Sequence, residues 1–111
     1  LIGGVNNDTL IGGAGNDRLE GIAGVDNFSG GSGDDTLIAG DGGSTLDGGA
    51  GDDMYYISAE SFPLSTIRDT GTRGSDIVFI SASDGPFVAT LVSSIEHMVF
   101  TATGNATANI T

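Results

Sequence analysis

The most constraining feature of this sequence is a nine-residue period that fills its first half. Successive units place glycines mostly at their first, second and fourth positions and, in all but one unit, an Asp at the sixth. Every unit carries a large apolar residue at the eighth position. Recurrence at a fixed period predicts a solenoid in which similar units stack along an axis. The units are residues 3–11, 12–20, 21–29, 30–38, 39–47 and 48–56.

Each unit divides into a turn and a short strand. Positions one to six hold most of the 20 glycines, which favour positive φ and close approach of neighbouring backbone. Positions seven to nine form a strand in which the central side chain points away from its two neighbours. Two units then make one coil with a strand on each side, and stacked coils pair their strands in parallel. The side chains expected between the two sheets are Leu10, Leu19, Phe28, Leu37, Leu46 and Tyr55.

The charge of the chain limits both its stability and its partners. A net charge of −12, with no Lys and three Arg, makes the compact state self-repelling. The thin interior is expected to leave residues 1–56 disordered without a counter-ion. Nucleic acid is excluded as a partner because phosphate binding needs clustered Lys and Arg. There is no Cys for a disulfide or thiolate site, and no apolar run approaches the ~20 residues of a membrane span.

The acidic turns favour calcium as that counter-ion. Calcium takes six to eight oxygen ligands from carboxylates and carbonyls, and glycine-rich turns expose carbonyls. Because units n and n+2 lie on the same edge of the coil, Asp17 faces Asp35 and Asp35 faces Asp53. Asp8 faces Asp26 in the same way on the other edge. One divalent ion would neutralise each pair, so metal binding and folding are expected to be a single process.

The units GGAGNDRLE, GGSGDDTLI and GGAGDDMYY resemble the hemolysin-type, or RTX, nonapeptide G-G-x-G-x-D-x-U-x. The resemblance covers residues 1–56 and recurs six times in phase. It implies an all-β fold, a right-handed parallel β-roll, with Ca²⁺ held between successive turns on both edges. It also implies an extracellular or cell-surface bacterial protein exported by type I secretion.

The resemblance further implies the calcium ligands. In that family one turn supplies the carbonyls of positions two and four and its Asp. The turn two units later supplies the carbonyls of positions one and three and its own Asp. The first site would comprise Gly4, Asn6 and Asp8 with Gly21, Ala23 and Asp26. The second would comprise Gly13, Gly15 and Asp17 with Gly30, Ser32 and Asp35. The third would comprise Gly31, Gly33 and Asp35 with Gly48, Ala50 and Asp53.

One intermediate site departs from this pattern. It would comprise Ile22, Gly24 and Asp26 with Ala39, Asp41 and Ser44. Neutral Ser44 predicts a weaker or empty site unless Asp41 or Asp47 substitutes, and Ile22 in place of Gly is expected to strain its turn. About three to four calcium ions are therefore expected in total.

Residues 57–111 form the second expected segment, after the period stops. Stretches rich in β-branched and aromatic residues alternate with Gly and Pro breaks and predict strands. This segment is expected to cap the roll or lead toward a further repeat. Related proteins commonly carry an Asp where this chain has Ser58, which argues against a site below Asp53.

The function expected is a non-enzymatic calcium-binding module of a larger secreted protein. Leu1 and Ile2 fit positions eight and nine of a preceding unit, as expected for a piece of a longer array. No catalytic residue is assigned: His97 has no plausible partner, and neither H-E-x-x-H nor G-x-S-x-G occurs. The expected partners are calcium and the rest of the parent chain, and the oligomeric state is left open.

Two rival functions remain open from the sequence. The chain could be a structural or adhesive array that contacts sugars or other chains, which an exposed patch of Tyr56, Phe62 or Phe87 would favour. It could instead be part of a catalytic domain, which turnover by the isolated chain would reveal.

Overall fold

The computed structural model describes residues 1–58, 65–71, 74–82, 86–89, 95–102 and 107–110, and every regular element within these ranges is a β-strand. No helix in these ranges is long and apolar enough to cross a membrane. The strands are β1 (Ile2–Gly4), β2 (Thr9–Ala14), β3 (Arg18–Ile22), β4 (Asn27–Ser32), β5 (Thr36–Ile38), β6 (Thr45–Ala50), β7 (Met54–Ser58), β8 (Thr66–Ile67), β9 (Asp76–Ala82), β10 (Pro86–Ala89), β11 (Ile95–Ala102) and β12 (Thr107–Ile110).

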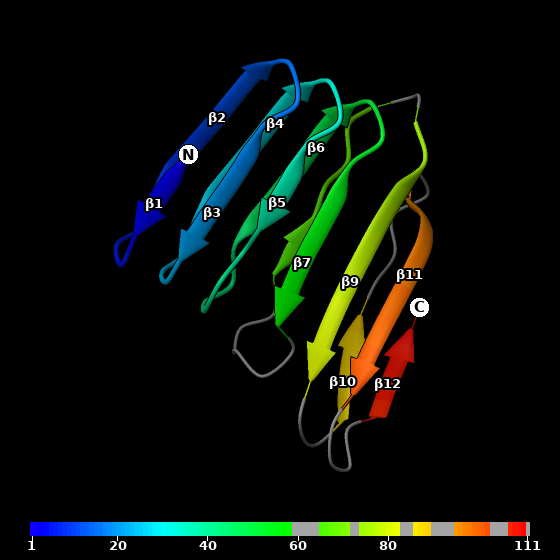
Figure 1. The fold of residues 1–111 in the computed structure, drawn as a ribbon. Coiled ribbons are helices and arrows are strands. Elements are labelled where there is room, and N and C mark those ends of the chain that lie inside the picture. Colours follow the sequence, from blue (N-terminus) through cyan, green and yellow to red (C-terminus); the bar gives the residue numbers. More distant parts are fainter. Residues whose placement is uncertain (59–64, 72–73, 83–85, 90–94, 103–106, 111) are drawn as a thin grey trace.

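The strands form two facing parallel sheets, as the nine-residue period requires. One sheet has the order β1-β3-β5-β7-β9-β11 and the other β2-β4-β6-β8, with β10 and β12 forming a further parallel pair. Successive strands therefore alternate between the sheets, and the coils stack side by side (Figure 1). The register pairs Leu19 with Leu37 and Leu10 with Phe28, each one coil apart. The all-β parallel β-roll predicted from the sequence is confirmed.

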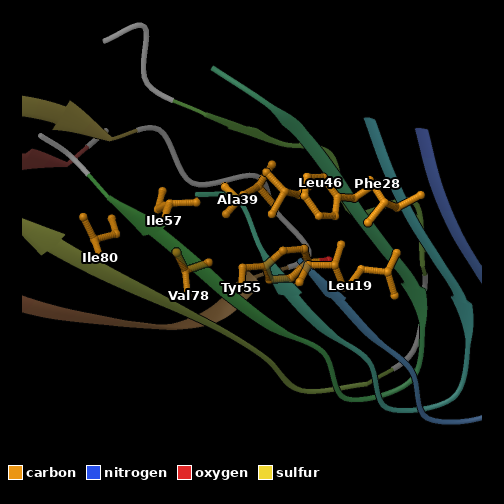
Figure 2. Packing of buried hydrophobic residues seen from close by; sticks show 11 residues of the cluster. Leu19, Phe28, Ala39, Leu46, Tyr55, Ile57, Val78 and Ile80 are labelled. Carbon is orange, nitrogen blue, oxygen red and sulfur yellow. The ribbon is translucent and has the colours of Figure 1, made fainter. Parts of the chain in front are cut away.

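The interior of the roll is a narrow double row of apolar side chains. All six residues at position eight are buried, as predicted. Figure 2 shows Phe28 and Leu46 from one sheet lying over Leu19 and Tyr55 from the other. The same core cluster extends through Ile57, Val78 and Ile80, beyond the regular repeats.

The geometric repeat continues after the exact period ends at Tyr56. Ile67 of β8 pairs with Leu46, and Val78 of β9 pairs with Tyr55, so both occupy the place of a position-eight residue. The spacings are 21 residues (67 − 46) and 23 residues (78 − 55), instead of 18 within the repeats. The connecting turns have therefore grown longer while the strands kept their register.

Backbone conformation explains the glycines at positions two and four. Gly31 and Gly33 have φ of 112° and 117°, a region that L side chains rarely adopt. A Cβ on either would also collide with a carbonyl oxygen of the coil before it. Ile22 is the non-Gly residue of positive φ in the described ranges, at 79°, which confirms the strain expected in its turn.

Candidate metal centre

The Asp residues at position six stack along the two edges of the roll. The backbone N–H of Asp17 donates to Oδ1 of Asp35, and that of Asp35 donates to Oδ1 of Asp53, each at 2.8 Å. On the opposite edge the N–H of Asp8 donates to Oδ1 of Asp26, also at 2.8 Å. Each side chain thus reaches back to the preceding turn on its own edge. The facing pairs predicted from the period are present.

The second carboxylate oxygen of these residues has an unusual environment. The Oδ2 atoms are buried and accept no hydrogen bond in Asp8, Asp17, Asp26, Asp35 and Asp53. Each lies on the inner side of its own turn, near the glycine at position one; an added Cβ on Gly12 would be 2.7 Å from Oδ2 of Asp17. A buried carboxylate oxygen without a partner is costly, so a cation at this place would stabilise the turn.

Backbone carbonyls of two successive turns point into the gap between them. The carbonyl oxygens of Gly13 and Gly15 point forward at Gly31 and Gly33. From the following turn, the Gly30 carbonyl points back toward Gly12, 2.7 Å from where a Cβ would lie. The Ser32 carbonyl accepts the Gly15 N–H at 2.8 Å. Positions two and four thus face forward, and positions one and three face backward.

The same arrangement recurs one coil further on. The carbonyl oxygens of Gly31 and Gly33 point at Gly49 and Gly51, and the Ala50 carbonyl accepts the Gly33 N–H at 2.8 Å. A carbonyl oxygen has two lone pairs, so one hydrogen bond leaves capacity for a further partner.

These donors fit a hard divalent cation. All of them are oxygens, as calcium prefers, and each gap between two position-six Asp residues combines carbonyls with two carboxylates. Within the described ranges no three His, Cys, Asp or Glu side chains form a metal-binding group, so carbonyls must complete each site. The ligand roles assigned from the sequence stay predictions, but their groups meet at the predicted gaps.

Burial raises the pKa of Asp35 and Asp53, two of the stacked carboxyls. The pKa of Asp53 is raised to about 6, chiefly by burial and further by the negative charge of Asp35 and other carboxylates, although the Asp35 N–H opposes the shift. Burial likewise raises the pKa of Asp35, assisted by the charge of Asp17 and Asp34. A cation in the gaps would favour the ionised form.

The intermediate gap differs in its chemistry. Ser44 is buried; its Oγ accepts the Asp26 N–H at 3.0 Å and lies 3.5 Å from the carbonyl of Gly24, a predicted ligand. Asp47, one of the two residues expected to be able to replace the missing carboxylate, accepts hydrogen bonds from the N–H and the hydroxyl of Thr70 at 2.9–3.0 Å, and its part in the site stays a prediction. A weaker site at Ser44 stays a prediction.

Position five has a role that the sequence reasoning missed. The side chains of Asn7, Asn16, Asp34 and Asp52 each accept a backbone N–H from the following turn on their edge. These bonds run in the direction opposite to those of the position-six carboxylates, so in the gaps that follow these four residues the two turns are joined from both sides. The signal was visible as short Asn or Asp side chains at position five in four of the six units.

Asp76 was also missed. Its Oδ1 accepts the Asp53 N–H at 2.8 Å, which continues the stack below Asp53 although Ser58 does not. The sequence signal was Gly71, Gly74 and Asp76 followed by an apolar strand, which is the spacing of positions one, four and six of a nonapeptide turn.

Comparisons with known proteins agree with this geometry. A family model described as the RTX calcium-binding nonapeptide repeat (4 copies) matches residues 2–37 and 29–56, about half of the chain. No curated protein and no solved structure matches the chain significantly.

Proposed function

Because the chain belongs, through residues 2–56, to the RTX calcium-binding nonapeptide repeat family, we propose that it is a module that folds when calcium binds and thereby stabilises a larger extracellular protein. Repeats of this family bind calcium and are structural, and they typify secreted bacterial proteins. What we propose is that calcium binding drives folding of this chain and that the folded chain stabilises the larger protein.

One observation carries the proposal: the five buried Oδ2 atoms that accept no hydrogen bond. The charge of −12 opposes compaction, and buried carboxylates oppose it further. Calcium between the turns would remove both penalties, so binding free energy becomes folding free energy. An export role follows from the same coupling, because a chain that needs calcium stays unfolded where calcium is scarce and folds where it is plentiful.

The proposed ligand sets are those assigned from the family pattern. Three gaps have an Asp on both sides, and the Ser44 gap is proposed to be weak. Three to four ions would bind residues 1–56, and residues 57–111 would cap the roll or lead toward a further repeat. Asp35 borders two gaps, so we propose that its carboxylate contributes to two calcium sites and that its loss weakens calcium binding most.

Circular dichroism of the 111-residue chain during a calcium titration tests the proposal. We expect a cooperative gain of β-structure at or below about millimolar calcium, reversal by a chelator, and little response to magnesium. An equally folded chelated sample would contradict calcium-coupled folding.

A matched pair of variants locates the binding. Asp35→Asn keeps the acceptor for the Asp17 N–H but removes the ligand charge, and should raise the calcium midpoint at least about tenfold. Asp34→Asn removes the same charge one residue away, and Asn16 shows that an amide can accept the position-five N–H. Equal midpoints for the two variants would argue against Asp35 as a ligand.

A specific observation favours a second candidate, a surface that binds sugar. Tyr56 stacks on Phe79 with ring centroids 4.7 Å apart and an interplanar angle of 9°, and Tyr56 is 39% exposed. A hollow beside the pair is also lined by Ile57, Ile80 and Ser81. Phe62 and the side chain of Phe87 lie outside the described residues. Loss of binding to a glycan array in Tyr56→Ala, with calcium affinity retained, would support this candidate.

A further inference from the structure

Tyr55 differs from the other residues at position eight. The other five position-eight side chains are hydrocarbon, whereas Tyr55 brings a hydroxyl into the core. Its ring lies in the row of core side chains (Figure 2), and Tyr55 pairs in register with Leu37 and Val78 of the neighbouring strands. The residue is fully buried. A hydroxyl at this depth needs a hydrogen-bond partner, because burying an unpaired one costs free energy.

The hydroxyl has that partner in the turn of its own unit. The backbone N–H of Gly48 donates to Oη of Tyr55 at 2.9 Å, and both groups are buried. Gly48 stands at position one of the unit, and its carbonyl oxygen points back toward Gly30 of the preceding turn. The hydrogen bond thus joins the core to a residue whose carbonyl faces the gap between Asp35 and Asp53.

The hydroxyl also lies beside the carboxylate of Asp53. A Cβ added to Gly48 would collide with both Oη of Tyr55 and Oδ2 of Asp53, so the two oxygens occupy the same side of Gly48. The Asp53 Oδ2 atom accepts no hydrogen bond. Tyr55 therefore contacts the residue that supplies one assigned calcium ligand and lies next to the carboxylate that supplies another.

We propose that Tyr55 is a positioning residue of the calcium site between Asp35 and Asp53: its hydroxyl fixes Gly48 and thereby holds the Gly48 carbonyl at the gap. The hydroxyl acts through Gly48 and is not itself a ligand. Glycine has more backbone freedom than any other residue, so the bond removes arrangements in which this carbonyl turns away. This inference rests on the proposed function, since it concerns one of the proposed calcium gaps.

Removal of one hydroxyl tests the role. Tyr55→Phe keeps the ring but leaves the Gly48 N–H without its acceptor. Circular dichroism should show a calcium midpoint raised about twofold to tenfold, the effect of losing one hydrogen bond. Tyr56→Phe is the matched control, because it makes the same change in the next residue, whose side chain is 39% exposed. Its calcium midpoint should equal that of the unmodified chain.

Strontium, a larger ion of the same charge, distinguishes positioning from a simple loss of stability. A loss of stability raises the calcium and strontium midpoints by the same factor. Discrimination between hard cations depends on the size and flexibility of the ligand set. A loosened Gly48 carbonyl should therefore raise the calcium midpoint more than the strontium midpoint, so the ratio of the two should fall in Tyr55→Phe.

The other edge of the roll offers the reciprocal variant. Phe28 follows Gly21 by seven residues, as Tyr55 follows Gly48, and Cζ of Phe28 lies 3.0 Å from where a Cβ on Gly21 would be. Phe28→Tyr should bring a hydroxyl to Gly21, beside Oδ2 of Asp26, and lower the calcium midpoint. A purely structural effect predicts the opposite sign, because a hydroxyl buried without a partner is destabilising.

The outcomes separate this role from the proposed function. An unmodified chain that does not respond to calcium sinks both. Calcium-dependent folding with an unchanged midpoint in Tyr55→Phe, or with calcium and strontium midpoints raised by equal factors, overturns the positioning role alone. If Tyr55→Phe does not fold in calcium, or strontium folds neither chain, Phe28→Tyr decides: a lower calcium midpoint supports the role, and an unchanged or higher one refutes it.

Discussion

Ile22 illustrates how single residues depart from the repeat at a local cost. Its φ of 79° places a β-branched side chain in the left-handed region, where the units around it use glycine. Its side chain is 46% exposed, so it gains little burial in return. A position-two residue with a positive φ is tolerated here because the turns above and below fix the backbone.

Replacing Ile22 with Gly should therefore stabilise the calcium-loaded chain by about 1 kcal/mol, since glycine adopts this φ without strain. Chemical denaturation in excess calcium measures the effect. Ile11→Gly is the comparison, because Ile11 lies in strand β2 and is 64% exposed, and glycine should destabilise a strand. A loss of stability in Ile22→Gly would show that its apolar contacts outweigh the strain.

At the scale of strands and turns, each strand contributes little by itself. β5 holds three residues, of which Leu37 alone is fully buried. Such a strand persists because β3 and β7 flank it in register and because the turns at its ends are clamped by position-five and position-six side chains. Cohesion thus comes from stacking between coils and not from the strand itself.

Leu37→Ala should consequently lower the free energy of unfolding by about 2–5 kcal/mol, because the thin interior has few neighbours able to fill the cavity. Ile11→Ala, on the exposed face, should change it by less than about 0.5 kcal/mol. Denaturation of both variants at one fixed calcium concentration makes the comparison. Similar losses would mean that position eight does not form the core.

The strands and their register were predictable from the sequence wherever the period was exact. Position eight identified the buried face because strand side chains alternate, and 18 residues per coil set the pairing. Beyond Tyr56 the turns lengthen, so spacing no longer identifies the equivalent residue. Ile67 and Val78 were recognisable only when the strands had been paired with β6 and β7.

At the scale of the whole molecule, charge and shape act together. The Cα radius of gyration is 13.0 Å, with extents of 40 × 31 × 17 Å, so the roll is a thin slab. Acidic side chains concentrate at its two edges. The carboxyls that are buried there are not solvated, so water does not screen their negative charges. The folded chain is therefore expected to respond to anything that neutralises the edges, whether calcium or protons.

Acidification should partly replace calcium. In the calcium-free chain burial raises the pKa of Asp53 to about 6, and burial together with contact with Asp69 raises that of Asp76 to about 7. Folded pKa values above the ordinary 3.8 mean that the contribution to stability is fully present below about pH 3.8 and is lost as pH rises through 6–7. The groups that face this pair are Asp34, Asp35, Asp69 and Tyr55.

Circular dichroism of the chelated chain between pH 8 and pH 4 should thus show β-structure increasing toward acid. In calcium the direction reverses, because protons compete with the ion for the same carboxylates. Asp76→Asn should show a smaller acid-induced gain than the unmodified chain. A chelated chain whose β-structure is constant across this range would refute the linkage.

The sequence by itself determined the parallel roll, the inward-facing residues at position eight and the paired Asp residues. With an exact period, residues 18 apart occupy the same place in successive coils and therefore lie next to each other. Tertiary structure alone decided which oxygens face each gap, that Thr70 engages Asp47, and that Asp76 follows Asp53 at a distance of 23 residues. The physical reason is that a turn of any length can return a strand to the same register. Once the number of residues per coil varies, the sequence spacing no longer shows which residues of successive coils contact each other.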